Sequence, residues 1–457
     1  MDARGLSDAP RGRRGGSIIT HLSMEQRIRI VIVGNGFGGV YTARHLQSLV
    51  ERGLAEITII GRANHFLFTP LLHEVATGGL SPTSVVEPLH EVFRHSNIRC
   101  LEMEVGKVDL AEQAVIGACR GTPERVSYDY LVIASGAETN AYGIKGVAEH
   151  AYALKTLADA VAIRNRIIQA VEEASATTDV VKRKSLLSFA VVGAGPTGVE
   201  LVSEMIEFLE ELVGDYYSKN LSLADISVSL ISSGPDIITQ FVPTLRKKAL
   251  DILTAKKVTV LLNMAVCEVT EQGVLAKCGT TEPSMLSAGT VVWVAGVKGT
   301  PVSLVERSGV APVVVHPSGR LVVSEQLQLP GYEQVFALGD SATHLASLDG
   351  RPLPMLAQVA EQEAEVVAAN IKSLIESRIS GRPASLFPYK LTLKGMLLSL
   401  GQWQAVGDIY GFHLSGPLMW WLWRTAYLSK FLSWRKRCKI VFEWTINLFS
   451  PRDITRV

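Results

Sequence analysis

Residues 27–33 read RIRIVIV, and residues 34–39 directly after them read GNGFGG. The first stretch is a short apolar run, which is typical of a strand buried on both of its faces. After the glycines comes the helical pattern VYTARHLQSLV, and a further apolar run at residues 56–60 predicts a second strand. A glycine-rich turn that joins a buried strand to a helix and then to a second strand predicts a βαβ unit of the dinucleotide-binding type.

The same arrangement occurs a second time in the chain. Residues 188–192 (SFAVV) lead into residues 193–198 (GAGPTG), a helical pattern follows, and residues 226–231 (ISVSLI) predict the returning strand. One GxGxxG motif is weak support for a nucleotide site, because glycine turns recur by chance, but two copies in the same context are strong support. The sequence therefore predicts an α/β protein with two Rossmann-like, doubly wound dinucleotide-binding domains.

Within each motif the three glycines have separate tasks. The first permits the tight turn, the second lets the backbone approach a pyrophosphate, and the third allows close packing of the helix against the strand. They are Gly34, Gly36 and Gly39 in the first motif, and Gly193, Gly195 and Gly198 in the second. Two such sites predict two dinucleotides, which we interpret as a tightly bound FAD and as NADH or NADPH in the role of substrate. This pair of cofactors is typical of a flavoprotein reductase.

Three further apolar strands are expected to end beside these cofactors. Residues 128–136, 291–296 and 335–341 each run into small residues or into Gly-Asp, where a ligand can approach the backbone closely. The candidate cofactor contacts at these strand ends are Ala134, Gly136, Gly296, Gly339 and Asp340.

The overall composition excludes several other classes of protein. Hydrophobic residues make up 47% of the 457 residues and the formal net charge is +1, so the chain is neither a disordered protein nor suited to nucleic acid. None of the five cysteines stands in a CxxC pair, which argues against a zinc ribbon, an iron–sulfur site or a redox pair. We predict no metal site, and we place the protein in a reducing, cytosol-facing compartment.

The C-terminal tail differs from this average in charge and in aromatic content. Residues 409–457 carry eight basic side chains against two acidic ones, and six of the seven tryptophans lie at or after Trp403. Such a composition is typical of a segment that docks on a membrane surface. The apolar stretch at residues 409–423 is too short, and too broken by glycine and proline, to span a bilayer, which needs about 20 residues.

Two helices are expected in this tail. Pro417 is suited to the first position of a helix over residues 418–433. In the segment after it, polar side chains recur at steps of three and four, which predicts an amphipathic helix with a basic polar face. The polar positions are Lys436, Lys439, Glu443 and Asn447, and the apolar face carries Cys438, Val441, Phe442, Leu448 and Phe449. Either this module lies on the lipid bilayer surface, or it packs on the enzyme itself or in a dimer interface.

These patterns divide the chain into four parts. Residues 1–24 contain no signal-peptide core and are expected to be a disordered extension. An FAD-binding domain at residues 25–150 and 296–385 is split around an NAD(P)H-binding domain at residues 151–295. A membrane-association module follows at residues 386–457.

Four further motifs resemble those of the type II, non-proton-pumping NADH:quinone oxidoreductases, and the resemblance runs from about residue 27 to the C-terminus. Residues 70–78 (PLLHEVATG) resemble the run beside the flavin, and residues 134–136 (ASG) resemble the turn after the returning strand. Residues 339–340 (GD) are similar to the pair whose carboxylate holds the ribityl chain of the flavin. Residues 357–362 (AQVAEQ) resemble the stretch at the quinone pocket. This last motif is the discriminating one, because the others occur across two-dinucleotide flavoproteins.

The resemblance implies an enzyme that passes hydride from NADH or NADPH to FAD and then two electrons to a membrane quinone, without pumping protons. It implies that Glu200 lies beside the nicotinamide, and that Gln358, Gln362 and Lys394 lie at the quinone. His73 is expected to pack beside the flavin, and a role as proton donor to the quinone stays open. Together with the tail, the resemblance implies a peripheral (monotopic) protein on the cytoplasmic face of the plasma (inner) membrane. Whether two copies form a homodimer is left open.

Three positions depart from the family pattern. Gly61 and Ser232 stand where the second strand of each βαβ unit normally ends in the acid that binds a ribose hydroxyl, and Glu363 stands where the quinone motif often has glutamine. Because no acid at Ser232 repels a 2′-phosphate, the choice between NADH and NADPH stays open. Two other functions stay open as well: a soluble flavoprotein reductase with a protein acceptor, and a degenerate membrane-attached flavoprotein that acts as a sensor.

Overall fold

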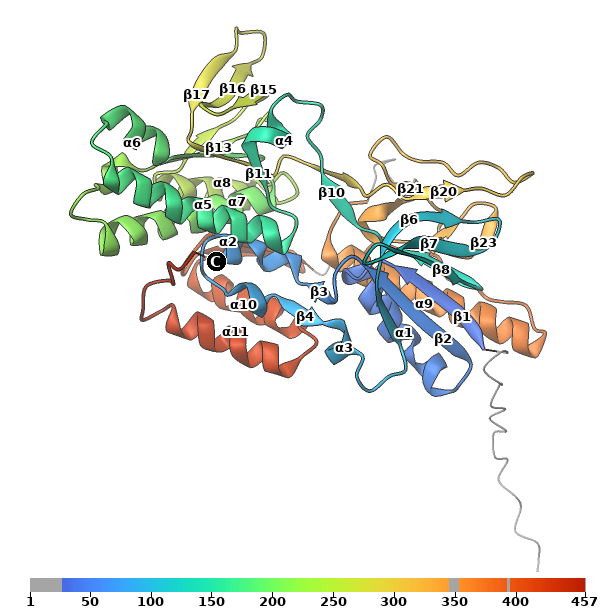
Figure 1. The fold of residues 1–457 in the computed structure, drawn as a ribbon. Coiled ribbons are helices and arrows are strands. Elements are labelled where there is room, and N and C mark those ends of the chain that lie inside the picture. The colour runs from blue at the N-terminus through green and yellow to red at the C-terminus, as the bar shows by residue number, and fades with distance from the viewer. Residues whose placement is uncertain (1–26, 345–352, 393–394, 457) are drawn as a thin grey trace, which may run out of the picture.

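The strand β1 (Ile28–Val33) lies near the centre of the first of two large, mainly parallel sheets (Figure 1). The computed structural model that contains it describes residues 27–344, 353–392 and 395–456. The sheet has the order β22-β23-β9-β1-β2-β5, and its β22 runs antiparallel to β23. Its other strands are β2 (Ala55–Gly61), β5 (Arg99–Glu102), β9 (Tyr130–Ile133), β22 (Gln328–Leu329) and β23 (Tyr332–Ala337). Every residue of β1 except Arg29 is buried, as the apolar run predicts.

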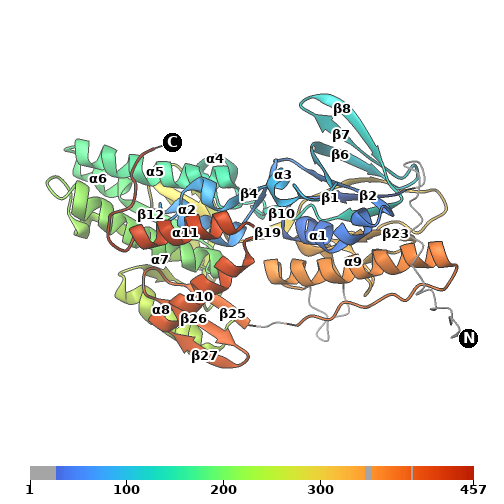
Figure 2. The same cartoon turned by 90° about the horizontal axis from the view of Figure 1, so that it is seen from below.

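Helices and a second layer of strands cover the faces of this sheet. The helices α1 (Phe37–Glu51) and α9 (Ala357–Ser380) pack against each other (Figure 2). The other layer is a four-stranded sheet that consists of β6 (Glu104–Asp109), β7 (Ala114–Cys119), β8 (Thr122–Ser127) and β20 (Ser303–Val305). Since β22, β23 and α9 come after the second large sheet in the chain, the first sheet is assembled from two separate stretches of sequence.

The second large sheet is parallel throughout and has the order β11-β18-β12-β13-β14. Its strands are β11 (Ala151–Ala153), β12 (Ser188–Val192), β13 (Ser227–Ile231), β14 (Thr259–Leu261) and β18 (Thr290–Trp293). The helices beside it are α5 (Leu157–Ala176), α6 (Val180–Leu186), α7 (Pro196–Glu211) and α8 (Pro243–Ala255). An antiparallel extension consists of β15 (Met264–Thr270), β16 (Gly273–Cys278) and β17 (Ser284–Ser287).

In both sheets the strand order reverses at the strand that precedes a glycine turn. Thus β1 lies between β2 and β9, and β12 lies between β13 and β18. In doubly wound sheets the ligand crevice opens outside the carboxyl ends of the strands at this reversal. The predicted α/β class with two doubly wound dinucleotide-binding units is confirmed, whereas the exact domain limits stay a prediction.

Short elements connect the two sheets. The strands β10 (Ala137–Thr139) and β19 (Val297–Gly299) form an antiparallel pair between them. The remaining short elements are β3 (His65–Leu67), α2 (Leu72–Ala76), β4 (Val86–Pro88), α3 (Leu89–Val92), α4 (Val147–His150), β21 (Leu321–Val322) and β24 (Ala342–Thr343). The helix α2 matters for the site below, because it comes from the PLLHEVATG motif and packs against both α5 and α7.

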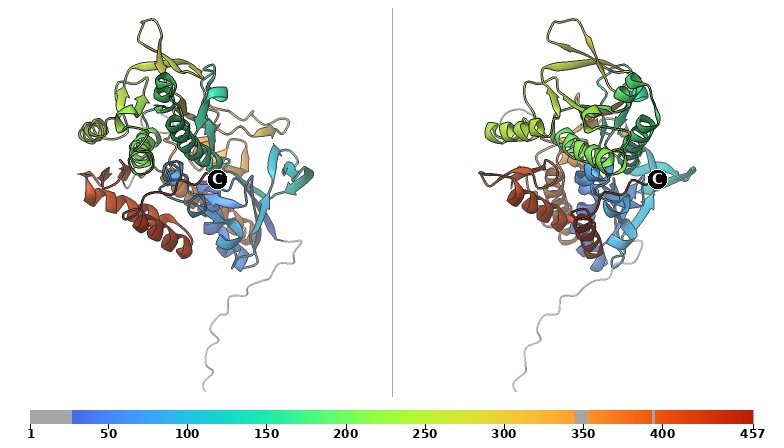
Figure 3. Two further views of the ribbon diagram at one scale, coloured as in Figure 1. Left: turned by 60° about the vertical axis from the view of Figure 1, so that its left-hand side comes forward. Right: turned by 90° about the vertical axis from the view of Figure 1, so that its left-hand side faces the viewer.

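The C-terminal module is a three-stranded antiparallel sheet followed by two helices, drawn in red on the outside of the molecule in Figure 3. Its elements are β25 (Gly395–Ser399), β26 (Ala405–Ile409), β27 (Phe412–Ser415), α10 (Pro417–Lys430) and α11 (Trp434–Ile446). The helix α10 begins at Pro417 as predicted, but it ends at Lys430 rather than near residue 433, because Phe431 is extended. Among the helices that the structure describes, none has the length and hydropathy of a membrane-spanning segment.

The amphipathic helix α11 turns its polar face toward the protein body. Lys436 Nζ donates to the carbonyl oxygen of Thr83 at 2.6 Å, and Asn447 Nδ2 donates to the carbonyl oxygen of Gly79 at 2.7 Å. The carboxylate of Glu443 accepts hydrogen bonds from the loop before β4 at the same place. Of the predicted apolar face, Cys438, Val441, Phe442 and Phe449 are exposed, whereas Leu448 is partly buried against the core.

Candidate active site

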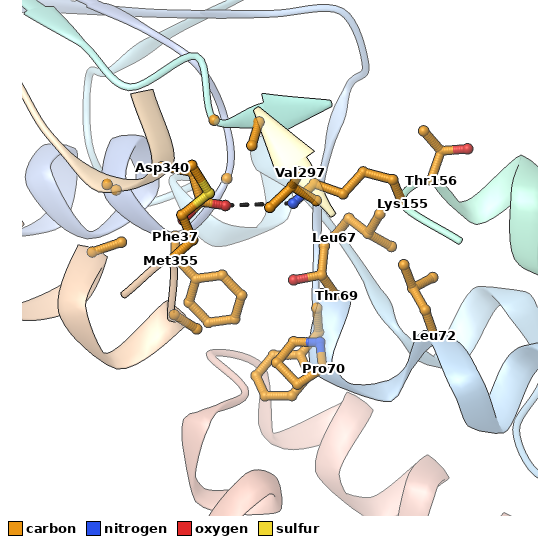
Figure 4. Close-up of a pocket in the computed structure, with 18 of the residues that line it drawn as sticks. Phe37, Leu67, Thr69, Pro70, Leu72, Lys155, Thr156, Val297, Asp340 and Met355 are labelled. Carbon is orange, nitrogen blue, oxygen red and sulfur yellow. Dashed lines mark hydrogen bonds and ion pairs between the residues drawn. The ribbon is translucent and has the colours of Figure 1, made fainter. Parts of the chain in front are cut away.

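One large cavity lies between the two parallel sheets and has a volume of about 1660 Å³. Its walls come from the first glycine turn, from strand ends of both sheets, from α7 and α9, and from the C-terminal module. Figure 4 shows side chains that line it, among them Phe37, Leu67, Pro70 and Met355. Pockets for one drug-sized ligand measure about 300–1,000 Å³, so this cavity has room for more than one ligand.

The first glycine turn leads from β1 into α1 along the wall of the cavity. Gly34 has φ +115°, and a Cβ atom there would lie 2.0 Å from the carbonyl oxygen of Ala134, so only glycine fits. A Cβ atom at Gly39 would lie 1.8 Å from the carbonyl oxygen of Gly34. Gly36 instead faces open space, with no described atom within 4 Å of such a Cβ. No described side chain caps α1, so the N–H groups of its first turn are available to an anion.

The second turn, from β12 into α7, repeats this geometry. Gly193 has φ +116°, and Gly198 packs against its carbonyl oxygen, whereas Gly195 faces open space. The glycines themselves do not line the cavity, but the adjoining Pro196 and Thr197 do. The two turns therefore fit the pyrophosphates of two dinucleotides, each at the N-terminus of a helix that no described side chain caps.

The missing acid at Gly61 has a structural explanation. Asn35, the second residue of the first glycine turn, donates hydrogen bonds from Nδ2 to the carbonyl oxygens of Ala63 (2.7 Å) and His65 (2.8 Å). Its side chain thereby lies over the end of β2, and a Cβ atom at Gly61 would stand only 2.3 Å from Asn35 Cγ. An aspartate or glutamate cannot occupy position 61 while Asn35 lies there.

Ser232, at the corresponding place in the second unit, closes a local turn instead. Its hydroxyl accepts a hydrogen bond from the backbone N–H of Gly234 at 3.2 Å. Arg246 on the following helix is held by Asp236 at 3.1 Å and by the carbonyl oxygen of Phe241. Asp236 and Arg246 are thus bonded to each other, and in the described part of this loop no carboxylate stands at position 232 itself to distinguish NADH from NADPH.

The predicted contacts at the strand ends all lie in the wall of the cavity. They are Ala134 and Gly136 after β9, Gly296 after β18, and Gly339 and Asp340 after β23. Within the cavity, Lys155 Nζ lies 3.4 Å from Asp340 Oδ2 (Figure 4). Lys155 connects β11 to α5, so this ion pair joins the two halves of the molecule.

Glu363 lies behind this wall rather than in it. Its side chain is 3% exposed, and its carboxylate accepts the backbone N–H of Gly339. Burial raises the pKa of Glu363 to about 8, and the charge of Asp340 also raises it. Glu363 thus supports the Gly339–Asp340 turn from behind.

Glu200 and His73 form a buried pair in the cavity wall. His73 Nδ1 lies 3.8 Å from Glu200 Oε2, and the two residues are 2% and 7% exposed. Burial lowers the pKa of His73 to about 3 and raises the pKa of Glu200 well above its usual value. His73 is therefore neutral near pH 7, and burial favours the protonated form of Glu200, so their contact is not an ion pair. The backbone N–H of Ser399 in β25 donates to Glu200 Oε1 at 3.2 Å, so the C-terminal module touches this pair directly.

The C-terminal module also closes one end of the cavity. The side chains that line this end are Met396 and Leu397 of β25, Ile409 of β26, and Tyr427 of α10. Tyr427 packs edge-on against Phe68, with the two ring centroids 6.0 Å apart. At the same end Lys430 forms an ion pair with Glu361 on α9.

The three residues predicted at the quinone have different places. Gln358 lines the cavity. Gln362 lies one turn later on α9, but its Nε2 donates to the carbonyl oxygen of Thr392 at 2.7 Å and its Oε1 accepts from the N–H of Thr392 at 3.3 Å. The structure therefore does not bring Gln362 into the cavity. Lys394 and the extension at residues 1–24 lie outside the described residues, and their roles stay predictions.

Sequence reasoning misses several groups that lie in this wall or directly behind it. Asn35 stands inside the glycine motif, and its side chain could have been recognised as the group that fills the space at Gly61. Lys155, Ser399 and Tyr427 carry no local signal, because each reaches the site from a segment far away in the chain.

The chain matches known proteins along most of its length. Residues 28–364 match the pyridine nucleotide-disulphide oxidoreductase family, and residues 393–453 match the NDH2 C-terminal domain. The type II NADH:quinone oxidoreductase Ndh of Mycobacterium tuberculosis is 31% identical over 93% of this chain and 89% of that protein. The internal alternative NAD(P)H-ubiquinone oxidoreductase A1 of Arabidopsis thaliana mitochondria is 31% identical over 94% of this chain and 86% of that protein.

A solved structure has the same fold. Plasmodium falciparum NDH2 in complex with NADH aligns with a TM-score of 0.83 at 22% identity, over 94% of this chain and 100% of that chain. The match to the NDH2 C-terminal domain covers the module that closes the cavity, and it separates this chain from the wider group of two-dinucleotide flavoproteins. The chain belongs to the type II NADH:quinone oxidoreductase family.

Proposed function

We propose that this protein is an FAD-dependent enzyme that oxidises NADH or NADPH and passes two electrons to a membrane quinone, without pumping protons. The observation that carries the proposal is the single cavity whose walls contain the first glycine turn, the start of α7 after the second turn, and the C-terminal module. The family to which the chain belongs supports the same reaction.

The two turns and the strand ends would hold the cofactors. The turn at Gly36 would hold the pyrophosphate of FAD at the N-terminus of α1, and Asp340 would hold the ribityl chain, with Lys155 beside it. Pro196 and Thr197 would stand beside the second dinucleotide. When bound, FAD supplies the redox chemistry, since it accepts a hydride from the nicotinamide and releases two electrons to the acceptor.

The protein itself orients the ligands and supplies protons. Reduction of a quinone to a quinol consumes two protons together with two electrons. Burial raises the pKa of Glu200 and so favours its protonated form, and its carboxyl lies in the cavity wall, where a proton can be released. The neutral His73 beside it can pass a proton on, and Gln358 can donate a hydrogen bond to a quinone carbonyl.

The C-terminal module presents apolar side chains to the outside. Since the polar face of α11 is bonded to the protein body, the opposite face is exposed, with Phe442 66% and Phe449 83% exposed. The other large, exposed apolar residues of the module are Trp403, Tyr410, Phe412, Leu418, Trp421, Leu422, Trp434, Val441 and Ile446. Such groups mark a contact surface, and its aromatic character suits a membrane interface. This surface supports a peripheral association with a membrane. We propose the cytoplasmic face of the plasma membrane, which the absence of paired cysteines in the sequence favours.

Vesicle binding tests this docking surface. We expect Phe442→Ser combined with Phe449→Ser to reduce cosedimentation with anionic phospholipid vesicles by about tenfold, and to leave the reduction of a short-chain quinone unchanged. Val314→Ser combined with Val315→Ser is the matched control, because these exposed valines lie in the body of the protein. If the apolar face instead joins two copies, the phenylalanine variant binds vesicles normally and loses self-association in size-exclusion chromatography.

The reaction is tested by the visible spectrum of the purified protein. Flavin bands that bleach with NADH or NADPH and return with a short-chain quinone would support the whole sequence of steps, and the two nicotinamides would be ranked in the same experiment. If quinone fails to reoxidise the flavin, the result favours a reductase whose electron acceptor is a protein. If the protein retains no flavin, the sensor without enzyme activity is the remaining function.

A further inference from the structure

Arg452 lies in the segment after α11 and is bonded to two helices at once. This segment leaves the C-terminal module and ends beside α2 and α5, where Figure 1 marks the C-terminus. The side chain of Arg452 is only 11% exposed. Its guanidinium donates to the carbonyl oxygen of Thr77, the C-cap of α2, at 3.2 Å and pairs with Glu204 of α7 at 3.2 Å.

The contacts with α7 extend along a row of glutamates. Glu200, Glu204, Glu207 and Glu211 follow one another at steps of four, three and four residues, so they share one face of the helix. Beyond Glu204, the guanidinium of Arg452 lies 3.5 Å from Glu207 and 3.6 Å from Glu211. Its backbone N–H also donates to Glu211. Arg452 therefore contacts three of the four carboxylates, and the fourth, Glu200, lies at the cavity end of the same row.

The two helices that Arg452 joins are the ones that carry the buried pair of the cavity. His73 lies on α2, four residues before Thr77, and Glu200 lies on α7, four residues before Glu204. The guanidinium of Arg452 is bonded to both helices, and this fixes the distance between α2 and α7. The bonded residues lie one helical turn after His73 and Glu200, whose side chains are 3.8 Å apart.

We infer that Arg452 is a positioning residue for the reaction: by joining α2 to α7 it holds Glu200 and His73 at their working distance inside the cavity. This inference rests on the proposed function of Glu200 as a proton-carrying group. It makes the last residues of the membrane module part of the support of the active site, although they contact neither the cavity nor any expected ligand.

The charges around this row predict the direction in which the pH profile changes. The groups that face Glu200 are His73 and Glu74 of α2, Glu204 of α7, Tyr427 of α10 and the Ser399 N–H of β25. The charged groups near Arg452 are Glu204, Glu207 and Glu211 of α7, Glu74 of α2, and Arg424 of α10. Lys256, the C-cap of α8, pairs with Glu207. The charge of Glu204 is one cause of the raised pKa of Glu200.

Removal of Arg452 therefore acts on Glu200 through Glu204. The guanidinium of Arg452 lies 3.2 Å from Glu204 and offsets its negative charge. Without that offset, the charge of Glu204 raises the pKa of Glu200 further, and Glu200 keeps its proton to a higher pH. The alkaline limb of the pH profile then moves to higher pH.

The test uses the full-length, FAD-loaded enzyme in detergent with a short-chain quinone, so that membrane binding does not enter the measurement. We expect Arg452→Gln to lower kcat at pH 7 by about tenfold or more, because a small misplacement far from the chemistry is enough for such a loss. The KM for NADH should stay within about twofold, and the alkaline limb should move to higher pH. Arg452→Lys should restore part of kcat, since a lysine can pair with only part of the row.

Arg456→Gln is the matched control. Arg456 lies in the same segment, but it pairs with the half-exposed Glu172 at 3.3 Å, so its loss should leave kcat and the pH profile unchanged. If Arg452→Gln instead behaves as the wild type while Glu200→Gln changes kcat and the profile, the inference is wrong and the proposed function stands. If Glu200→Gln also behaves as the wild type, the proposed role of Glu200 is wrong.

A second variant covers the case in which Arg452→Gln is purified without FAD. Glu204→Gln keeps Arg452 bonded to Glu207, Glu211 and Thr77, and removes only the charge next to Glu200. We expect it to shift the alkaline limb to lower pH with FAD retained. A wild-type profile for Glu204→Gln would overturn the coupling through this row.

Discussion

The two βαβ units of this protein have the same arrangement of strands, turn and helix, and both lack the acid that normally ends the second strand. The side chains at that position differ between them. Both begin with a buried strand and a glycine whose φ lies near +115°, and both lack a carboxylate at the end of the second strand. In the first unit the Asn35 side chain fills the space beside Gly61, so an acid fits there only if Asn35 moves. In the second unit Ser232 only closes its own turn. The absence of the acid thus has a different structural setting in each unit.

The helices of the two units differ as well. The buried face of α1 carries no acidic side chain, whereas α7 buries Glu200 and Glu204. The first unit is therefore built to hold a ligand, and the second unit also carries groups that bind and release protons. Substitutions at matched positions of the two units test this difference.

The same substitution in both glycine turns should have different consequences. In Gly34→Ala the new Cβ overlaps the carbonyl oxygen of Ala134, and we expect purified protein with less than about a tenth of the wild-type flavin absorbance. In Gly193→Ala the new Cβ overlaps Ala295, and we expect normal flavin content but no bleaching by NADH. Dithionite, which needs no nicotinamide site, should still bleach the second variant. Equal loss of flavin in both variants would contradict the assignment of the two turns.

Restoring the family acid in the first unit should weaken FAD binding. Gly61→Asp forces the new side chain into Asn35, and overpacking of this kind costs about 1–3 kcal/mol, or about 5- to 150-fold in the dissociation constant of FAD. Reconstitution of the apoprotein with FAD measures this constant. Combining Gly61→Asp with Asn35→Gly should recover most of the loss. Normal FAD affinity in the single variant would show that Asn35 moves freely.

Restoring the acid in the second unit should change selectivity instead. Ser232→Asp places a carboxylate where a 2′-phosphate would lie, so kcat/KM for NADPH should fall about tenfold while that for NADH stays within about threefold. Steady-state kinetics with both nicotinamides checks this, and Ser233→Asp at the neighbouring exposed position is the control. A parallel fall for both nicotinamides would mean that position 232 does not face the adenosine ribose.

The buried acids beside α7 should make stability depend on pH. Burial raises the pKa of Glu74 to about 7, so the folded protein holds a proton that the unfolded chain releases near its usual pKa. This contribution to stability, on the order of 3 kcal/mol, is complete at pH below the unfolded pKa and is lost as pH rises through about 7. Glu74→Gln should therefore lose less stability than the wild type between pH 5 and 8.

Thermal unfolding measures this difference. For a protein of this size we expect the fall in Tm between pH 5 and 8 to be about 2–4 °C smaller in Glu74→Gln than in the wild type. The glutamine can still accept the indole N–H of Trp444, which lies 2.6 Å from Glu74 Oε2. Glu271→Gln, at an exposed position, is the control and should follow the wild type. Identical pH dependence in Glu74→Gln and the wild type would assign the effect to other groups.

The sequence alone determined the class of fold and most of the cofactor-facing backbone. Both βαβ units are contiguous stretches, and the need for glycine at Gly34 follows from the local backbone together with one neighbouring strand. Strand ends such as Gly339–Asp340 were predictable for the same reason, because an apolar run that stops at small residues already marks the place where a ligand reaches a sheet.

Which polar side chains remain available to a ligand depends on contacts between distant segments of the chain. Gln358 and Gln362 share a helix face, but the fold lays Thr392 beside Gln362 and uses its amide there. The ion pair of Lys155 with Asp340 spans 185 residues, and that of Arg452 with Glu204 spans 248. A side chain bonds to whatever group the fold brings within about 3 Å. No local pattern records that neighbour, so the support of the active site became visible only in three dimensions.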